Sequence, residues 1–238
     1  MGTATRYRTE TAIMTSPLAS PLRIALVGMS GAGKTFWTKR LAASGHPQAC
    51  CDDQIEQRLK SRLEAGGYAG INGVAAWMGW PNSPTYAERE AEYLAEEIAV
   101  LDEVLTKLEA DRASDLILDT TGSVIHSGNN ILMRVRRQMT VVYLAASPTE
   151  QQLLIERYLT DPKPVLWRGA FQPKPGETPR ETVARCYPSL IAARRQSYEA
   201  LAHRTVPVAN LQTLARHAAS ESDSAAAFLK RIQPGEGR

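Results

Sequence analysis

Residues 28–35 read Gly28-Met29-Ser30-Gly31-Ala32-Gly33-Lys34-Thr35, and this stretch decides the fold. It matches the phosphate-binding pattern G-x-x-x-x-G-K-[ST] at every fixed position. The residues before it, 24–27, are all apolar and are typical of a buried strand. A strand that leads into a glycine-rich turn and then a helix aims several backbone N–H groups, and the positive end of the helix dipole, at one point. The stretch therefore predicts a loop that binds the phosphates of a nucleotide.

The fixed residues of this loop have separate physical tasks. Glycine lets the backbone approach a polyphosphate closely, the Lys34 ammonium can reach the β- and γ-phosphates, and the Thr35 hydroxyl can ligate Mg²⁺. We therefore expect Lys34 to act in catalysis as well as in binding. The residues expected to bind the nucleotide are Gly28, Ser30, Gly31, Ala32, Gly33, Lys34 and Thr35.

Composition narrows the class of protein. The chain has 238 residues, of which 43% are hydrophobic, enough for one sizeable core with room for a lid or insertion. The net charge is only +3 and the basic residues are dispersed, so we expect no nucleic-acid partner. No apolar run approaches the roughly 18 residues of a membrane span, so we expect no membrane contact either. No pattern in the sequence indicates an oligomeric state.

The cysteines and the N-terminal residues indicate the cellular location. Cys50, Cys51 and Cys186 form no disulfide framework, which predicts a reducing, cytoplasmic location. We expect residues 1–21, rich in Thr, Ser, Ala and Arg, to be a disordered leader, with a transit peptide as the alternative. Residues 22–238 are expected to form a single domain.

Apolar runs alternate with helical patterns along this domain. The expected strands are residues 22–27, 49–51, 116–118, 140–145 and 205–209. The expected helices are residues 35–43, 53–63, a short one within 70–84, 86–111, 122–137, 148–159, 182–203 and 225–232. Strands that alternate with helices predict an α/β fold of three layers, in which helices cover both faces of a parallel sheet of about five strands.

Acidic residues follow two of the expected strands. Ligands of such sheets bind at the carboxyl ends of the strands, where Asp52, Asp53 and Asp119 are expected. Asp119 can associate with Mg²⁺, directly or through water, or simply cap the following helix. One of Asp52 and Asp53 can accept a proton from an attacking hydroxyl, while the alternative for each is a cap of the helix that begins there.

A proline-rich basic segment spans residues 160–179, and we expect it to be a mobile flap. Arg157, just before it, and Lys163 and Arg168 within it can screen the charge of a transferring phosphoryl group. The alternative for each is an ordinary solvated surface residue.

The order of these pieces resembles shikimate kinase, a small P-loop kinase of the nucleoside-monophosphate-kinase type, over residues 22–232. Beyond the phosphate loop, the strongest match is residues 119–144, and Asp52 with Ile55-Glu56 resembles the family's D-x-D-x-x-I-E. Residues 164–166 resemble the R-P-L-L of its lid, and Arg194 to Tyr198 its R-x-x-x-Y. The resemblance implies a P-loop NTPase fold with a flexible lid at about 160–179, an acceptor-binding region at about 53–111, and ATP and Mg²⁺ as cofactors.

The departures from the family lie on the acceptor side. Cys50 stands where the family has the aspartate that assists Mg²⁺, so Asp119 is expected to take over that task. Ala87 replaces an arginine that binds the acceptor, and Thr120 and Thr121 replace two glycines. Losing a bidentate arginine removes much of the recognition of a planar carboxylate, so we do not expect shikimate to be the substrate.

These patterns predict a kinase that transfers the γ-phosphoryl group of ATP to a hydroxyl of a small, anionic molecule. The residues expected in catalysis are Lys34, Asp52 and Arg157. The residues expected to bind the acceptor are Asp52, Thr121, Gly122 and Arg194, and Arg194 is the reason to expect an anionic group. The residues expected at the metal are Thr35 and Asp119.

Two alternatives stay open. The first is a nucleotide-binding regulator that has lost catalysis, because Cys50 stands in place of an acid. The second is a kinase resembling the zeta-type toxins, which phosphorylate nucleotide sugars; residues 66–84, with Trp77 and Trp80, would then build a larger acceptor pocket.

Overall fold

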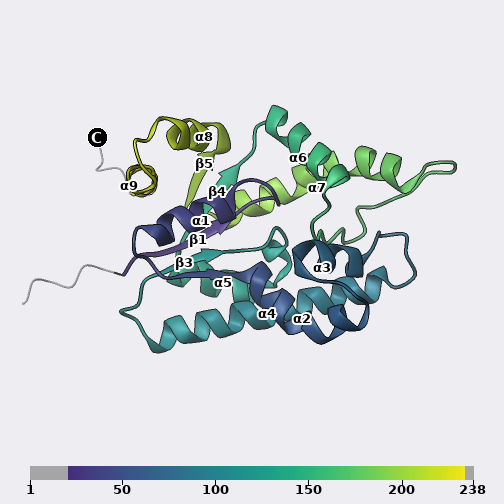
Figure 1. The fold of residues 1–238 in the computed structure, drawn as a ribbon, viewed down its shortest axis with the longest axis horizontal. Helices are drawn as coiled ribbons and strands as arrows, with labels where there is room; N and C mark the ends of the chain where they lie inside the picture. The colour runs from purple at the N-terminus through teal and green to yellow at the C-terminus, as the bar shows by residue number, and fades with distance from the viewer. Residues whose placement is uncertain (1–20, 234–238) are drawn as a thin grey trace, which may run out of the picture.

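Five parallel strands form one sheet in the spatial order β2-β3-β1-β4-β5, in a computed structural model that describes residues 21–233 (Figure 1). The strands are β1 (Arg23–Val27), β2 (Gln48–Cys50), β3 (Leu116–Asp119), β4 (Thr140–Ala145) and β5 (Arg204–Pro207). Every neighbouring pair is parallel. The predicted α/β fold with a parallel sheet is thereby confirmed. The predicted leader, residues 1–21, lies outside the described residues except for Pro21.

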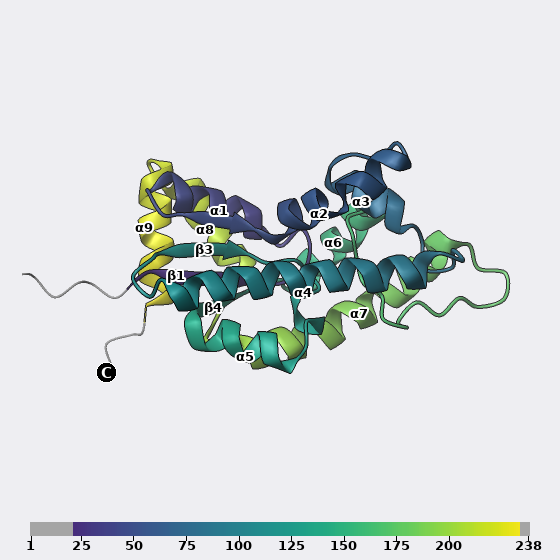
Figure 2. The ribbon, with the colours of Figure 1, turned by 90° about the horizontal axis from the view of Figure 1, so that it is seen from below.

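Helices cover both faces of this sheet, as Figure 2 shows in side view. One face packs against α1 (Lys34–Ala43), α8 (Val208–His217) and α9 (Glu221–Ile232). The other packs against α4 (Tyr86–Ala110), α5 (Asn129–Gln138) and α7 (Pro179–Leu201). The strand pleat sorts the side chains, because Ile24 and Leu26 of β1 join the first core and Ala25 and Val27 the second. The three predicted layers are therefore present.

The remaining helices gather beyond the carboxyl ends of the strands (Figure 2). They are α2 (Cys51–Ala65), α3 (Gly70–Met78) and α6 (Pro148–Thr160). α2 packs against α3 and α4, and α6 packs against α7. The predicted acceptor-binding region at about 53–111 corresponds to α2, α3 and α4. No helix within residues 21–233 has the length and apolar character needed to cross a membrane.

Two helix starts are fixed by capping boxes. The Ser147 side chain accepts from the backbone N–H of Glu150, whose carboxylate bonds back to the Ser147 N–H, and Thr178 and Glu181 do the same for α7. Proline occupies the first turn of both helices, where its missing N–H costs nothing. α7 therefore begins at Pro179, three residues before the predicted start.

Two predictions about the elements were wrong. The helix expected over residues 122–137 is split into a 3₁₀ turn, η1 (Val124–His126), and α5, because Gly128 has a positive φ of 87° between them. The strand expected to reach residue 209 ends at Pro207, and α8 begins directly after it. α8 was not predicted.

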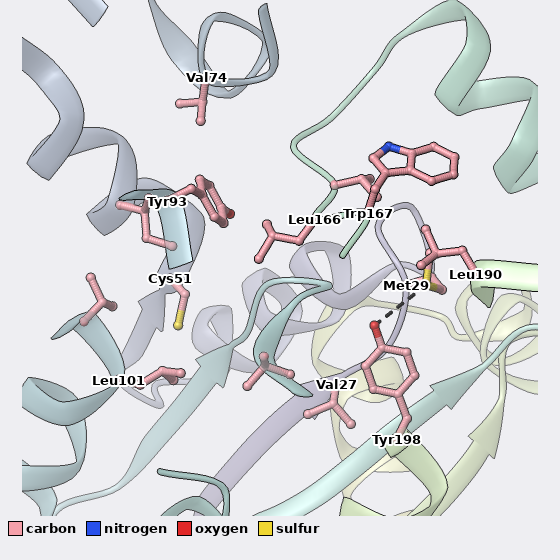
Figure 3. Close-up of a cluster of buried hydrophobic side chains, with 14 of the residues drawn as sticks. Val27, Met29, Cys51, Val74, Tyr93, Leu101, Leu166, Trp167, Leu190 and Tyr198 are labelled. Atoms are coloured by element: carbon pink, nitrogen blue, oxygen red, sulfur yellow. Dashed lines mark hydrogen bonds between the residues drawn. The ribbon is translucent and has the colours of Figure 1, made fainter. Parts of the chain in front are cut away.

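The centre of the predicted flap belongs to the hydrophobic core. Val165, Leu166 and Trp167 are only 4%, 0% and 1% exposed, whereas residues 168 and 172–176 are exposed. Figure 3 shows Leu166 and Trp167 among the buried side chains of this core. We call residues 165–168 the lid base. The expectation of one mobile flap over 160–179 thus needs correction, because burial of a large aromatic ring ties its middle to the protein.

Candidate active site

The phosphate loop joins β1 to α1, as predicted, and its glycines are required by geometry. Gly28, Gly31 and Gly33 have positive φ angles of 144°, 81° and 96°. A Cβ atom on Gly28 would lie 3.0 Å from the backbone oxygen of Leu144 in the neighbouring strand, and one on Gly31 would lie 3.0 Å from the side chain of Leu154. Other residues are therefore disfavoured at Gly28 by conformation and by the neighbouring backbone, and at Gly31 mainly by conformation, since the Leu154 side chain can shift.

Lys34 lies at the end of this loop, as the first residue of α1. It is 6% exposed, and its Nζ donates to the carbonyl oxygens of Gly28 and Met29 at 3.0 and 3.2 Å. A buried ammonium with fixed hydrogen bonds presents a positive charge at a defined point of the loop. α7 also contacts the loop, because the hydroxyl of its Tyr198 lies 3.7 Å from Sδ of Met29 (Figure 3).

A cavity of about 330 Å³ opens over the loop and brings most of the predicted site together. The predicted site residues that line it are Ser30, Gly31, Lys34, Thr35, Asp52, Gly122 and Arg157. Further lining residues are Cys50, Asp53, Ile71, Leu154, Tyr158, Asp161, Lys163, Pro164 and Tyr187. Phosphate-binding, acidic and basic side chains thus line one open cavity.

Asp119 lies beside this cavity at the carboxyl end of β3, in register with Leu26 of β1 and Cys50 of β2. It is 1% exposed, and its Oδ1 has no hydrogen-bond partner in the described part of the chain. Burial raises the pKa of its carboxyl, an effect that Lys34 and the Thr35 hydroxyl oppose. Burying a carboxylate oxygen without a partner costs free energy. A cation bound at this position would remove that cost.

The oxygen donors of Asp119 and Thr35 fit Mg²⁺, which prefers hard oxygen ligands. Within residues 21–233 no group of three His, Cys, Asp or Glu side chains could hold a metal ion. A Mg²⁺ ion held here would therefore take most of its ligands from phosphate oxygens and water, which is its usual mode in nucleotide sites.

Asp52 lies in the first turn of α2, and its Oδ1 accepts a hydrogen bond from the Tyr93 hydroxyl at 3.1 Å. Burial raises the pKa of Asp52 to about 6; Asp119 adds to the rise, while Lys34 and Tyr93 oppose it. A carboxylate that titrates close to neutral pH is suited to accept a proton. Neither Asp52 nor Asp53 caps α2, because the helix begins at Cys51 with Cys50 as its N-cap. The capping alternative was therefore wrong.

Thr121 and Arg194 do not line the cavity and have partners inside the protein. The Thr121 hydroxyl bonds to the Glu97 carboxylate and lies 3.0 Å from Ser123 Oγ. The Arg194 guanidinium donates to the carbonyl oxygens of Gly122, at 2.8 Å, and Leu166. Their expected contact with the acceptor stays a prediction, and in this structure both brace the backbone next to the cavity.

Two of the three expected basic residues face the cavity. Arg157 Nη1 lies 3.5 Å from the carbonyl oxygen of Gly31, and Lys163 pairs with Asp161 at 2.9 Å. Arg168 does not line the cavity; its φ of 48° is the only positive one among the described non-glycine residues.

Sequence reasoning missed a second open cavity of about 470 Å³ between α1 and α8. It shares only Gly31 and Arg157 with the first cavity. Its other lining residues are Ala32, Gly33, Phe36, Trp37, Val208, Leu211, Gln212, Ala215 and Arg216. No local signal in the sequence indicated this cavity, because about half of its wall comes from α8, which was not predicted.

Comparison with known proteins agrees with this architecture. No protein-family model and no curated protein matches the chain. Shikimate kinase from Acinetobacter baumannii, solved in complex with shikimate, is 25% identical with a TM-score of 0.54, over 89% of this chain and 93% of that one.

Shikimate kinase from Bacteroides thetaiotaomicron has the same TM-score of 0.54 at 19% identity, over 89% of this chain and 97% of that one, and this likeness concerns the fold alone. The chain therefore shares the P-loop fold of these shikimate kinases, as the resemblance in its sequence predicted.

Proposed function

We propose that this protein transfers the γ-phosphoryl group of ATP to a hydroxyl group of a small molecule. The observation that carries the proposal is that one cavity of about 330 Å³ is lined by Lys34 and Thr35 of the phosphate loop and also by Asp52 and Arg157. Phosphoryl transfer needs positioning and charge compensation more than covalent chemistry, and these are the groups that provide both.

The phosphate side of the cavity compensates negative charge. Lys34 would bind the β- and γ-phosphates, and Thr35 and Asp119 would hold Mg²⁺, which would neutralise phosphate charge when bound. Arg157, next to the Gly31 carbonyl, is placed to contact the transferring group as charge develops on it. The cavity between α1 and α8, which continues from Gly31 and Arg157, is the place we assign to the nucleotide base.

The acceptor side supplies a proton acceptor. Asp52 orients the acceptor hydroxyl and takes its proton, and its pKa of about 6 leaves it ionised at neutral pH. Tyr158 and Tyr187 form an aromatic wall, stacked at 4.7 Å between ring centroids. Movement of the exposed parts of the lid on either side of the lid base would exclude water, which competes as acceptor.

The lining does not favour one sign of charge on the acceptor. Arg194, the reason to expect an anionic group, has two of its guanidinium nitrogens bonded to backbone carbonyls. Asp52, Asp53 and Asp161 line the cavity, and they accept hydrogen bonds from hydroxyl groups. A panel of gluconate, glucose and glucosamine, which share a chain of hydroxyls and differ in charge, would assign the class.

The test is ATP turnover by the wild type and by Lys34→Ala, with Lys60→Ala as the matched control. Lys60 is an exposed lysine of α2 whose ammonium lies 3.8 Å from Glu64. We expect Lys34→Ala to lower turnover by about a hundredfold or more, and Lys60→Ala to leave it unchanged. Equal turnover by Lys34→Ala and wild type would overturn the proposal. Nucleotide binding without a phosphorylated product from any acceptor would favour the regulatory alternative.

A second candidate is a nucleotide-sugar kinase, and one observation favours it. A cavity of about 260 Å³, lined by Met78 and Trp80, shares Tyr158, Asp161, Lys163 and Pro164 with the first one and so adjoins it. Trp77 is 5% exposed in the core. Neither tryptophan lines the first cavity, so neither blocks a larger acceptor there. Trp80→Ala would then raise the KM of a nucleotide sugar and leave that of a simple sugar unchanged.

A further inference from the structure

The buried face of α4 is polar over the first half of the helix. Tyr86, Glu90, Tyr93 and Glu97 are spaced by four, three and four residues, so they form one stripe along the helix. Their exposed fractions are 6%, 8%, 1% and 0%. Farther along, the buried positions are apolar: Val100, Leu101, Val104, Leu105 and Leu108. Burial of a polar side chain is costly unless it has a hydrogen-bond partner. We therefore ask which groups these four side chains bond.

The first two residues of the stripe hold the lid base. The Tyr86 hydroxyl lies 2.8 Å from the carbonyl oxygen of Val165 and accepts a hydrogen bond from the amide N of Trp167 at 3.0 Å. Glu90 Oε1 accepts from the amide N of Arg168 at 3.0 Å and lies 2.9 Å from the same hydroxyl. Two side chains one turn apart thus bond three backbone groups of the lid base.

The next two residues hold the start of α2 and the turn after β3. Tyr93 donates to Asp52 Oδ1 at 3.1 Å. Glu97 accepts from Ser123 Oγ at 2.6 Å and from the hydroxyl of Thr121. Since Ser123 N also donates to Thr121 Oγ1 at 3.0 Å, the carboxylate of Glu97 closes a small network that fixes the turn.

Two of the held segments border the cavity through Asp52 and Gly122, and the lid base directly follows Pro164, which also lines it. None of the four stripe residues lines that cavity or the one between α1 and α8. From the opposite side, Arg194 of α7 bonds the carbonyls of Gly122 and Leu166 and so ties the turn to the lid base. The acceptor side is therefore held by residues that do not touch it.

We propose that the buried polar stripe of α4 positions the acceptor side of the cavity: Tyr93 orients Asp52, Glu97 the turn, and Tyr86 with Glu90 the lid base. The inference rests on the proposed function. It makes these four residues positioning residues, whose loss displaces the acceptor from the γ-phosphate without altering the phosphate loop. Displacements of about 1 Å can slow transfer by about a hundredfold.

The kinetic test compares Tyr93→Phe with the wild type. Tyr143→Phe is the control, because Tyr143 is also a buried tyrosine, 4% exposed, and it packs on Tyr198 of α7, away from the stripe of α4. The acceptors are gluconate, glucose and glucosamine, and ADP binding is measured by calorimetry. We expect Tyr93→Phe to lower the transfer rate by about tenfold or more, with the Kd of ADP changed by less than about twofold. Transfer like that of Tyr143→Phe, or a parallel loss of ADP binding, would overturn the proposal.

Hydrogen exchange tests the positioning without any acceptor. Tyr86→Phe should speed exchange of the peptide 163–170 by about fivefold or more, and Glu97→Gln should do the same for the peptide 118–126. The peptide 24–36, which contains the phosphate loop, should keep its wild-type rate in both variants. Exchange like that of Tyr143→Phe in both peptides would overturn the inference.

The two measurements separate the possible failures. If the wild type phosphorylates no acceptor while the exchange results hold, the proposed function fails and the positioning by α4 stands. If the wild type transfers phosphate and the exchange rates stay unchanged, the positioning fails and the proposed function stands.

Discussion

The thiol of Cys50 lies 4.0 Å from Oδ2 of Asp119, at register partners of β2 and β3. Burial is the main reason that the pKa of Cys50 rises to about 12, so its thiol stays neutral at physiological pH. A neutral thiol is a poor ligand for Mg²⁺, whereas the adjacent carboxylate has an oxygen without a partner in the described residues. Asp119 of the neighbouring strand can thus replace the family's aspartate that is missing at Cys50. This favours an active kinase over a regulator without catalytic activity.

The role of Asp119 predicts a change in metal dependence. Asp119→Asn removes the charge that would hold Mg²⁺, so we expect turnover to fall by about a hundredfold and to need more Mg²⁺. Titration of ATP turnover with Mg²⁺ checks this, with Asp102→Asn as the control, since Asp102 is exposed and pairs with Arg134. An unchanged Mg²⁺ requirement in Asp119→Asn would contradict the assignment.

The role of Asp52 predicts the pH dependence of activity. A general base must be ionised, and the pKa of Asp52 is raised to about 6, so kcat/KM should rise with pH and level off above about pH 7. Asp52→Asn should lose this acid limb together with about a hundredfold or more in rate. Asp53→Asn should keep the rise of kcat/KM on the acid side of the pH profile. If that rise disappeared in Asp53→Asn instead, the general base would be Asp53.

Glu97 predicts a pH dependence of stability. Burial raises its pKa to about 7, from 4.5, although Ser123 and Thr121 oppose the shift. A carboxyl whose pKa is raised on folding favours the folded state when protonated, so this contribution is lost as pH rises from about 4.5 to about 7. The loss is at most about 3 kcal/mol.

Glu97→Gln cannot ionise and therefore lacks this loss. We expect its Tm relative to the wild type to be higher at pH 8 than at pH 5, whatever the variant loses in hydrogen bonds. Thermal unfolding at the two pH values measures the difference. A Tm difference that is the same at both would show that the carboxyl is already ionised in the fold at pH 5.

Trp167 tests whether the lid base is part of the core. Its ring is 1% exposed, and Trp167→Ala should lower the free energy of unfolding by about 3–5 kcal/mol. Trp80→Ala is the matched control. Because Trp80 is 36% exposed, this variant should lower the free energy of unfolding by less than about 1 kcal/mol. Urea denaturation of the two variants gives both values. Similar losses would mean that the lid base separates easily from the protein.

Local signals predicted the sheet and the phosphate half of the site. The three central strands, β3, β1 and β4, are short and mainly apolar runs, and the loop of residues 28–35 is set by a contiguous pattern whose conformational demands fall on its own glycines. Asp119 could be placed because a residue at the end of a buried strand must lie at the carboxyl edge of the sheet.

Contacts between distant residues could not be predicted. Tyr93 and Asp52 are 41 residues apart, and Arg194 and Gly122 are 72 apart. In the sequence, Tyr93 is one residue of the expected helix 86–111, and nothing local shows that its hydroxyl meets a carboxylate. The proline-rich composition of 160–179 likewise conceals that its short apolar centre is buried.

The fate of the γ-phosphoryl group tests the proposed kinase activity most directly. Wild type, Lys34→Ala and Asp52→Asn would each receive γ-labelled ATP, Mg²⁺ and the panel of hydroxylated acceptors, and the products would be separated and counted. The proposed kinase activity predicts label in the phosphate ester of at least one acceptor with the wild type, and about a hundredfold less with either variant. Label found only in inorganic phosphate, or as much ester with Lys34→Ala as with the wild type, would contradict it.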